Sequence, residues 1–435
     1  MARPGRRAAR PGRPGAYRRE VHLVSERDLI CRFGSLPLAE PRVVAAGNFA
    51  TPRRLLGLFD TAVETYRLFV LNAQPPFPDR EGIVYETPFV GPAMRGHERL
   101  DYLPMRLSLV PRLFAMARPP DVVLLHTSPA RDGKVSLGIE VNILPAAIEQ
   151  VRSNGGLVVA QCNPHMPYTY GDGEIDAELV DLAVEVDEAL PAPLQREVGD
   201  MTMAIAAGVA PLVHDGATLQ AGIGEVPDAV VGLLQSRRGI RIWTEAMSDG
   251  VLTLERAGAL DTGSVITASF LFGSPELNTW ADGNKRVRML RTETVNDPSR
   301  IAAHPQMTSL NAAIEVDLWA QANASYVGGS IYSGFGGQPD FVVGALHSKG
   351  GQAIISLPSW HEKSGSSTIV GLLDAPATSF QHSVVVTERG SALIFGRSQR
   401  AQARLLIEET AHPDARPALW ELAGRRIGSR RTWSK

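Results

Sequence analysis

Cysteine is almost absent from this sequence. Its 435 residues include two cysteines, Cys31 and Cys162, which do not form a C-x-x-C pair. A chain of this length with two cysteines is not a disulfide-rich secreted scaffold, and it lacks the paired cysteines of zinc ribbons and thioredoxin-like redox sites. The composition therefore favours a reducing compartment, and we expect a cytoplasmic protein.

Long apolar runs and a strong net charge are also missing. No apolar run reaches the roughly 18 residues that a membrane helix requires, and the formal net charge is −2. A nearly neutral chain has no overall electrostatic attraction to polyanions or to acidic partners. We therefore expect neither a membrane nor a nucleic acid among its partners.

The histidines show no metal-binding pattern. None of the ten histidines has the spacing of a metal site, and His361-Glu362 lacks the second histidine of a zincin helix. The nucleophile elbow G-x-S-x-G of serine hydrolases is absent as well. We expect no metal site and no serine-hydrolase chemistry.

The first 19 residues differ from the rest in composition. Residues 1–19 carry seven arginines and no acidic residue, with prolines at Pro4, Pro11 and Pro14. Such a segment cannot bury a core and is expected to form a disordered basic tail. A transit peptide is the alternative, but the prolines would break its amphipathic helix.

The remaining chain has the pattern of a doubly wound α/β protein. Apolar residues make up 44% and charged residues 21% of the sequence, and the length suits two or three domains. Apolar runs at 121–126 and 157–161 predict buried parallel strands, and the pattern at 144–151 between them predicts a helix. This alternation predicts a parallel sheet covered by helices. Later in the chain, residues 309–318 predict a further strand, and Lys349-Gly350-Gly351 predicts a hairpin-like turn.

A short internal repeat suggests two related halves. Gly47 precedes Pro52 by five residues, Gly222 precedes Pro227 by five, and an aliphatic helix face follows each proline. Two such short matches also arise by chance. We predict two similar α/β domains, residues 20–200 and 201–435.

One stretch combines a glycine turn with a nearby carboxylate. Residues 216–234 read as a strand, a glycine turn and a helix opened by Pro227, and the strand 241–245 then ends on Glu245. Gly222-x-Gly224-x-x-Pro227 is not a dinucleotide fingerprint, because proline replaces the third glycine. Two interpretations stay open for the turn: a tight structural connection, or a backbone cradle for a ligand oxygen.

Glu245 and a second glycine-rich segment are the candidate functional features. Open α/β sheets bind ligands at the carboxyl ends of their strands, where Glu245 is expected, although a lone glutamate there is more often simply solvated. The segment 328–341 holds five glycines in fourteen residues. Because each glycine costs conformational entropy, this density favours close approach of the backbone to a ligand.

Several further motifs occur in a fixed order along the chain. They are 121–138, Asn163-Pro164-His165-Met166-Pro167, 215–234, Thr244-Glu245 through Ser248-Asp249-Gly250, 309–317, 332–341 with Gly344-Ala345, and Val386-Thr387-Glu388-Arg389-Gly390. In this combination the sequence resembles the acetyl-CoA hydrolase/transferase family of class I CoA-transferases, especially its 4-hydroxybutyrate and succinyl-CoA:acetate branches. The resemblance implies two similar α/β domains with the active site between them.

The resemblance also implies a mechanism and a set of site residues. Glu245, in the family's T-E-x-x-S-D-G motif, is the implied nucleophile, which would form an acyl-glutamyl anhydride and then a glutamyl-CoA thioester. Coenzyme A would be a substrate instead of a tightly bound cofactor, a small carboxylic acid the second substrate, and a homodimer or higher homo-oligomer the assembly. The implied binding residues are Gly222, Ile223, Gly224, Glu225, Val226, Asn323, Gly336, Gly337, Gly344 and Lys349.

Some positions depart from the family pattern and leave the acyl group open. The loop 129–134 is one residue shorter than usual, Ala246 replaces a methionine, and Arg389 replaces an aromatic residue. Arg131 and Arg389 are either partners for a substrate carboxylate or ordinary surface residues. Two alternative functions remain: an acyl-CoA hydrolase that uses the same glutamate, and a non-catalytic CoA-binding protein, which the presence of Glu245 disfavours.

Overall fold

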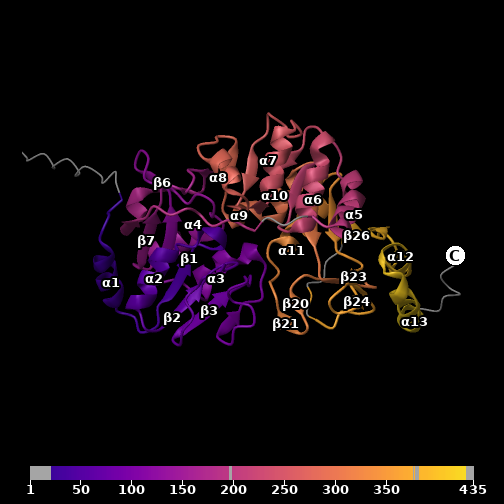
Figure 1. Cartoon of the computed structure of the whole chain (residues 1–435), viewed down its shortest axis with the longest axis horizontal. Helices are drawn as coiled ribbons and strands as arrows, with labels where there is room; N and C mark the ends of the chain where they lie inside the picture. The colour runs from indigo at the N-terminus through magenta and orange to yellow at the C-terminus, as the bar shows by residue number, and fades with distance from the viewer. Residues whose placement is uncertain (1–20, 195–197, 376, 378–381, 428–435) are drawn as a thin grey trace, which may run out of the picture.

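Two parallel sheets, each with its own helices, organise the protein. The computed structural model describes residues 21–194, 198–375, 377 and 382–427. Figure 1 shows the first half of the chain in indigo to purple on the left and the second half in magenta to yellow on the right. The predicted arginine-rich tail, residues 1–19, lies outside the described residues.

The first sheet has seven parallel strands. Their spatial order is β10 (Leu182–Glu185), β7 (Leu157–Cys162), β5 (Val122–Thr127), β1 (Arg42–Ala45), β2 (Tyr66–Phe69), β3 (Ile83–Thr87) and β4 (Leu100–Tyr102). Every residue of β5 and β7 is buried, as expected for central strands covered on both faces. On β1, Val43 packs with helices α1 and α2 on one face, and Val44 packs with α3 and α4 on the other.

The second sheet has six strands. Their order is β12 (Arg241–Ile242), β11 (Thr218–Ala221), β17 (Met307–Ala312), β22 (Gln352–Ser356), β26 (Val384–Thr387) and β27 (Gly390–Leu393), and only the last pair is antiparallel. Neighbouring residues of β22 again face opposite ways, because Ile354 joins the large central core and Ile355 joins a separate cluster with α12 and α13. The predicted α/β fold class is confirmed.

Helices cover the faces of both sheets. The α-helices are α1 (Glu26–Gly34), α2 (Arg53–Ala62), α3 (Val110–Met116), α4 (Leu144–Ser153), α5 (Asp200–Val209), α6 (Glu225–Leu233), α7 (Asp249–Arg256), α8 (Pro275–Ala281), α9 (Thr292–Val295), α10 (Pro298–Ala303), α11 (Gln338–His347), α12 (Gln399–Leu405) and α13 (Arg416–Arg426). Short 3₁₀ turns are η1 (Asn48–Ala50), η2 (Leu107–Leu109), η3 (Ala177–Leu179), η4 (Ala210–Leu212), η5 (Leu234–Ser236) and η7 (Pro413–Ala415), and η6 (Leu406–Thr410) is a π-helical turn. The boundary predicted at residue 200 falls on the first residue of α5, and it stays a prediction.

Small sheets lie at the junction of the halves and within each half. At the junction, β13 (Ala246–Met247) pairs with β15 (Phe270–Leu271). Strand β16 (Val287–Met289) pairs with β14 (Ile266–Ala268) on one side and with β8 (Tyr170–Gly171) of the first half on the other. The other small sheets are β6 (Lys134–Ser136) with β9 (Glu174–Asp176), β18 (Glu315–Asp317) between β19 (Ala322–Asn323) and β25 (Ile369–Val370), β20 (Tyr326–Val327) with β21 (Ser330–Ile331), and β23 (Trp360–His361) with β24 (Ser366–Ser367).

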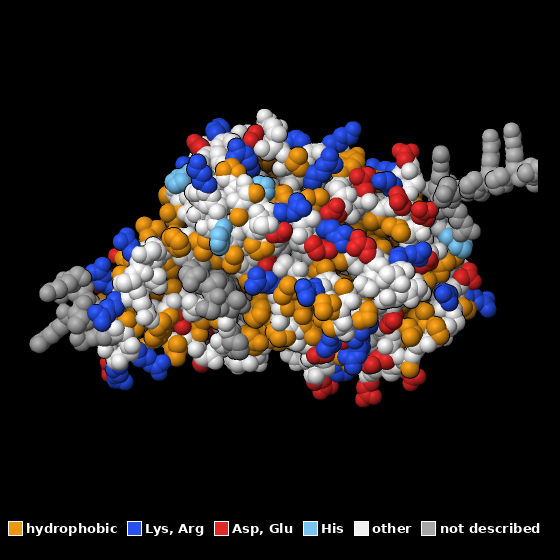
Figure 2. Space-filling model, turned by 180° about the vertical axis from the view of Figure 1, so that it is seen from behind, with side chains coloured by type: hydrophobic (Ala, Val, Ile, Leu, Met, Phe, Trp, Pro, Cys, Tyr) orange, Lys and Arg blue, Asp and Glu red, His pale blue; other side chains and the backbone are white. Residues whose placement is uncertain are grey.

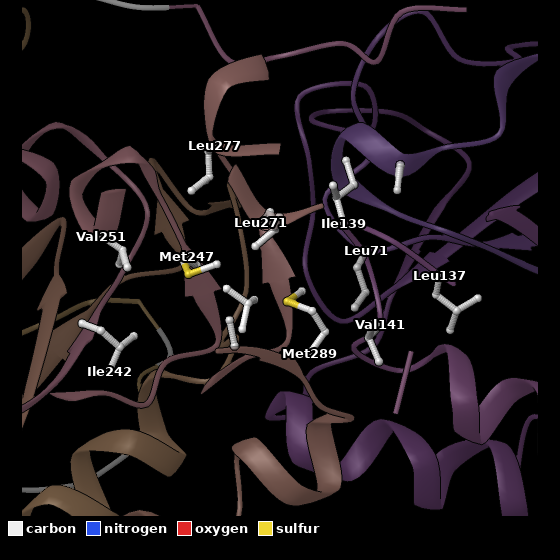
Figure 3. Packing of buried hydrophobic residues seen from close by; sticks show 14 of the residues in the cluster. Leu71, Leu137, Ile139, Val141, Ile242, Met247, Val251, Leu271, Leu277 and Met289 are labelled. Carbon is white, nitrogen blue, oxygen red and sulfur yellow. The ribbon is translucent and has the colours of Figure 1, made fainter. Parts of the chain in front are cut away.

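The two halves share one hydrophobic core at their junction. The Leu271 N–H donates to the Ile139 carbonyl at 2.9 Å, and the Val141 N–H donates to the Ser269 carbonyl at 3.0 Å. Figure 3 shows Leu271 beside Ile139, with Met289 in the same cluster. Because apolar side chains and backbone bonds both cross the junction, the relative position of the halves is well defined where the candidate site lies.

Three local predictions are wrong. The strand predicted at 309–318 is two strands, β17 and β18, because the chain turns after Ala312 to pair with β19 and β25. The turn at 349–351 is not hairpin-like, since β22 pairs in parallel with β17. Helix α6 begins at Glu225, two residues before Pro227, so the proline lies in its first turn.

The surface carries charges of both signs. Figure 2 shows Lys and Arg side chains intermingled with Asp and Glu on one face of the molecule, with apolar atoms between them. Among the described residues, no helix is long and apolar enough to span a membrane.

Candidate active site

Glu245 lies where the chain leaves the second sheet. Strand β12 ends at Ile242, so Glu245 is not at a strand end as predicted but at a bend just before β13. Its carbonyl accepts the N–H groups of Ser269 at 2.8 Å and Phe270 at 3.0 Å. These two bonds hold the bend and fix where the half-buried side chain projects.

The Glu245 carboxylate has an amide donor and an acidic neighbour. Asn296 Nδ2 donates to Glu245 Oε2 at 2.6 Å. Burial raises the pKa of Glu245 to about 7, the Asn296 bond opposes this rise, and the nearby Asp340 carboxylate adds to it. Glu245 therefore changes protonation close to neutral pH, in the range that suits an active-site group.

The second glycine loop packs directly against this carboxylate. A Cβ atom at Gly337 would collide with Glu245 Oε2 and with Asn296 Nδ2, and a Cβ at Gly334 would collide with the Pro88 carbonyl. The Leu107 N–H donates to the Gly336 carbonyl at 2.9 Å, which ties the loop to the first half. The backbone of this loop therefore lies close to the protein's own carboxylate, and its approach to a ligand remains a prediction.

A cavity of about 380 Å³ opens in front of Glu245. Both halves form its wall, and the second glycine loop lies along it. The lining residues include Asn48, Asn72, Phe89 and Asn142 from the first half, and Gly222, Ile223, Glu245, Phe270, Asn311, Tyr332, Gly336, Gly337 and Phe341 from the second. The site therefore lies between the halves, as the family resemblance implied.

The first glycine turn reaches the cavity only in part. Gly222 and Ile223 line it, whereas Gly224, Glu225 and Val226 do not. Gly224 has a φ of +139° and caps helix α6, which begins at Glu225. The turn thus presents its first two residues to the cavity and uses the next three to start the helix.

Three other implied binding residues lie away from the cavity lining. Asn323 is buried in β19, where its Oδ1 accepts the N–H groups of Ser325 and Tyr326. Gly344 lies in α11 against α10, since a Cβ there would crowd Ile301. Lys349 is exposed in the turn before β22. Their positions indicate roles in turn formation and helix packing, so their predicted contacts with CoA remain predictions.

Of the positions that depart from the family pattern, one lines the cavity and two do not. Ala246 lines the cavity. Arg131 is exposed over the Tyr168 ring, 4.8 Å from its centroid, and Arg389 Nε lies 3.1 Å from Glu388 Oε1. Neither arginine lines the cavity, so Ala246 is the one of these three departures that faces it.

Sequence reasoning missed the residues that set the electrostatics of the site. Asn296 precedes α10 and Asp340 lies in the first turn of α11, far from Glu245 in sequence. Asp340 is fully buried, accepts from Ser108 Oγ at 2.9 Å, and lies 3.3 Å from Arg106 Nη1. Burial raises the pKa of Asp340 to about 6. The position of Asp340 just after Gly336-Gly337 is the sequence feature that could have marked it as a site residue.

Within the described ranges, no group of three or more His, Cys, Asp or Glu side chains is arranged to hold a metal ion. The polar side chains that line the cavity are mainly amides, together with the Glu245 carboxylate and the Arg95 guanidinium, and such groups suit an organic ligand.

Comparison with known proteins identifies the family. The acetyl-CoA hydrolase/transferase N-terminal domain matches residues 87–194, and the C-terminal domain of the same family matches residues 273–423. The 4-hydroxybutyrate coenzyme A transferase of Clostridium kluyveri is 38% identical over 333 residues, which cover 74% of this chain and 76% of that protein. The chain belongs to the acetyl-CoA hydrolase/transferase family.

Two further relatives are similar to this chain over most of its length. The succinyl-CoA:acetate/propanoyl-CoA:succinate CoA transferase of Fasciola hepatica is 34% identical over 409 residues, covering 88% of this chain and 84% of that one. The crystal structure of RipA from Yersinia pestis has a TM-score of 0.86 at 27% identity and covers 93% of this chain and 98% of its own. The predicted family and the predicted enzyme class, CoA-transferase, are confirmed.

Proposed function

We propose that this enzyme moves CoA between an acyl-CoA and a small carboxylic acid through a covalent glutamyl-CoA thioester at Glu245. The observation that carries the proposal is the position of the Glu245 carboxylate, which lines the cavity between the halves with the backbone of Gly337 against it. A carboxylate held in this way has a fixed direction of attack and little surrounding water, which are the two conditions that a weak nucleophile requires.

The first half-reaction passes through an anhydride. Glu245 Oε attacks the thioester carbonyl, the C–S bond breaks, and CoA leaves as a thiolate. The thiolate then attacks the glutamyl carbonyl of the anhydride, so that glutamyl-CoA forms and the first carboxylic acid leaves as its carboxylate. In the second half-reaction an incoming carboxylate repeats these steps in reverse, restoring Glu245 and producing the new acyl-CoA.

Backbone donors near Glu245 suit the oxyanions of these steps. Helix α11 begins at Gln338, directly after Gly337, and the first N–H groups of a helix have no intrahelical acceptor. Such groups stabilise negative charge that develops at a carbonyl oxygen, and one well-placed donor is worth roughly 3 kcal/mol. The glycines of the loop let the backbone come this near.

The protonation of Glu245 sets the pH range of the proposed reaction. The nucleophile is the ionised carboxylate, and the pKa of Glu245 is raised to about 7 by burial. The Asn296 hydrogen bond favours the ionised form. We therefore expect kcat/KM to rise with pH through an acid limb near 7.

Steady-state kinetics test this proposal. Initial rates with acetyl-CoA and a series of carboxylates should give the parallel double-reciprocal lines of a ping-pong enzyme, and Glu245→Gln should reduce turnover to the assay limit. Glu245→Asp retracts the carboxylate by about one bond and should lower kcat about 100-fold with nearly unchanged CoA affinity. Intersecting lines, or normal turnover by Glu245→Gln, would overturn the proposal.

The same assay distinguishes the transferase from the alternative, an acyl-CoA hydrolase. A hydrolase releases CoA from acetyl-CoA at full rate without any acceptor acid, because water resolves the glutamyl-CoA. The proposed transferase releases almost no free CoA with or without an acceptor, because an added carboxylate takes up the CoA and leaves as the new acyl-CoA. Full acceptor-independent release would assign the hydrolase reaction instead.

A further inference from the structure

Asn296 presents its amide to Glu245 without a second side-chain bond to orient it. The residue is fully buried, its Nδ2 donates to Glu245 Oε2 at 2.6 Å, and its Oδ1 has no hydrogen-bond partner within the described ranges. Because no bond to Oδ1 orients the amide, its direction depends on the backbone at residues 295 and 296. The contacts of that backbone therefore decide how well Asn296 stabilises the ionised carboxylate.

Asn296 caps the end of α9, a single helical turn. Its N–H donates to the Thr292 carbonyl at 2.9 Å, and Pro298 opens α10 two residues later. The start of α9 is bound to the first half, because the Thr292 N–H donates to the Asn142 carbonyl at 2.9 Å. The last carbonyls of a helix have no donor within the helix. The end of α9 next to Asn296 therefore needs a donor from elsewhere in the fold.

Trp243 supplies that donor. Its indole Nε1–H donates to the Val295 carbonyl at 3.0 Å. Trp243 precedes Glu245 by two residues, and Val295 directly precedes Asn296. Two hydrogen bonds therefore connect the same two chain segments side by side, one from the Trp243 indole to the Val295 backbone and one from the Asn296 amide to the carboxylate. This closed arrangement fixes the amide relative to the carboxylate.

The indole ring comes from a well-fixed part of the fold. The Trp243 N–H donates to the Leu219 carbonyl of β11 at 3.2 Å, and the Trp243 backbone also bridges to Thr267 of β14. The ring lies against His304, with 4.3 Å between the centroids and an interplanar angle of 38°. It also packs on the apolar cluster Val295, Ile301, Met307, Phe341 and Ala345. Backbone and ring together therefore define where the indole N–H points.

Trp243 acts from outside the cavity. Neither Trp243 nor Asn296 is among the residues that line it. A ligand in the cavity therefore meets Glu245 and not the indole. An effect of Trp243 on the reaction has to pass through the residues that it holds in place.

Several ionisable groups surround Glu245. Asp340 of α11 raises the pKa of Glu245 and itself faces Arg106, and Glu245 in turn raises the pKa of the buried Glu140. Asp297 caps the start of α10, where hydrogen bonds, the first from a serine hydroxyl, lower its pKa. These groups set the electrostatic background against which the Asn296 bond acts.

The groups on the indole side are neutral or already paired. Burial lowers the pKa of His304, the charge of Arg241 acts in the same direction, and His304 is therefore uncharged at neutral pH. At the start of α9, Arg291 Nη2 pairs with Glu293 Oε1 at 2.7 Å. A substitution of Trp243 by another uncharged residue alters none of these charges. A change in the titration of Glu245 would then report on the Asn296 bond.

We propose that Trp243 is a positioning residue, whose indole N–H holds the end of α9 so that the Asn296 amide donates to the ionised form of Glu245. The inference rests on the proposed function of Glu245 as the nucleophile. Without the indole N–H, the buried Val295 carbonyl loses its donor, and a buried carbonyl without a partner is costly. The end of α9 then moves toward another donor, and the Asn296 bond to Glu245 weakens.

The pH profile of Trp243→Phe tests this role. Phenylalanine keeps an aromatic ring and removes the N–H. Because the Asn296 bond favours the ionised carboxylate, its weakening should move the acid limb of kcat/KM upward by roughly 0.5–1 pH unit, up to the shift for one lost hydrogen bond. The KM for acetyl-CoA should stay within about twofold, because Trp243 does not line the cavity. An acid limb at the wild-type pH would overturn the proposal.

Trp360→Phe is the matched control. Trp360 is partly buried, and its ring lies on His412 with 4.6 Å between the centroids and an interplanar angle of 39°, nearly the geometry of Trp243 on His304. It belongs to the small sheet of β23 and β24 and does not line the cavity. This variant should keep the wild-type acid limb. An equal shift in both variants would show a general effect of losing a tryptophan.

A double variant shows whether Trp243 acts through Asn296. In Asn296→Ala the amide is already gone, so adding Trp243→Phe should move the acid limb no further. Two residues that act through one interaction give such non-additive effects, whereas independent residues give shifts that add. Additive shifts would contradict the proposed route from the indole to the carboxylate.

Two further measurements keep each outcome decisive. If Trp243→Phe does not fold, a benzothienyl analogue of tryptophan at position 243 replaces the N–H by sulfur, keeps the bicyclic ring, and should give the same shift. The titration of Glu245 can also be followed without turnover, from the carboxyl infrared absorption that wild type shows and Glu245→Gln lacks. Absence of a Glu245 adduct from acetyl-CoA in wild type rejects the proposed function, while the infrared titration still decides the role of Trp243. An adduct with an unshifted Glu245 titration in the Trp243 variants rejects the positioning role alone.

Discussion

Gly337 leaves no room for a side chain beside Glu245: a Cβ built on its backbone would overlap the carboxylate oxygen Oε2. Gly337→Ala should therefore push the carboxylate aside and lower kcat/KM about 100-fold, the loss typical of a displacement near 1 Å at a reacting group. Circular dichroism and the unfolding midpoint should stay near wild type, because the φ of Gly337 is −91° and suits alanine.

Gly57→Ala is the control for this substitution. Gly57 is exposed inside helix α2, and an added Cβ would meet no atom within 4 Å. It should keep full activity and gain about 0.5–1 kcal/mol of stability from the better helix propensity of alanine. Equal activity of Gly337→Ala and Gly57→Ala would mean that Glu245 is not held where the mechanism requires it.

Removing the amide beside Glu245 should move the pH profile upward. The Asn296 hydrogen bond lowers the pKa of Glu245 against the effect of burial. In Asn296→Ala the pKa should rise above about 7, so that a higher pH is needed to ionise the nucleophile. The measurement is kcat/KM with acetyl-CoA from pH 5.5 to about 9, where one hydrogen bond is expected to shift the acid limb by roughly one unit. A limb that stays in place would show that another group limits the reaction.

Removing the acidic neighbour should move the profile the other way. The Asp340 charge raises the pKa of Glu245, so Asp340→Asn should lower that pKa and extend activity to lower pH. The amide keeps an oxygen that can accept from Ser108 and face Arg106, as the carboxylate does now. The two variants form a matched pair, and shifts in the same direction would contradict the electrostatic account of Glu245.

Glu140 should make the stability of the protein depend on pH. Its pKa is raised from 4.5 to about 8 in the folded protein, so the folded state favours the protonated form. Its contribution is fully present below the unfolded pKa near 4.5 and is lost as the pH rises through about 8, at about 1.4 kcal/mol per unit of pKa difference. Urea midpoints should therefore show Glu140→Gln stabilised relative to wild type at pH 8.5 compared with pH 5. A constant difference at both pH values would mean that Glu140 does not titrate in this range.

The sequence predicted the features that are local in the chain. The T-E-x-x-S-D-G motif marked Glu245, and the glycine density around Gly336 and Gly337 marked the loop that lies beside it. Alternating apolar runs predicted the α/β fold, because strands such as β5 and β7 are buried on both faces and read as continuous apolar segments.

The partners of Glu245 could not be predicted because they come from distant segments. The packing of α10 and α11 brings Asn296 and Asp340 near the Glu245 carboxylate. A backbone bridge between Glu140 and Phe270 brings Glu140 near it across the junction of the halves. Gly344 and Lys349 share the sequence neighbourhood of the glycine loop, but helix α11 carries them away from the cavity. The motif therefore identified the nucleophile, while its pKa is set by residues that the fold brings together.

Trapping the covalent intermediate tests the central claim most directly. The enzyme is incubated with acetyl-CoA and treated with borohydride, which delivers hydride to the glutamyl thioester, breaks its C–S bond and releases CoA thiol. Peptide mass spectrometry should then find residue 245 ending in an alcohol instead of a carboxylate, with no such change in Glu245→Gln. Reduction mapped to another residue, or an unmodified Glu245 in an enzyme that turns over acetyl-CoA, would contradict the mechanism.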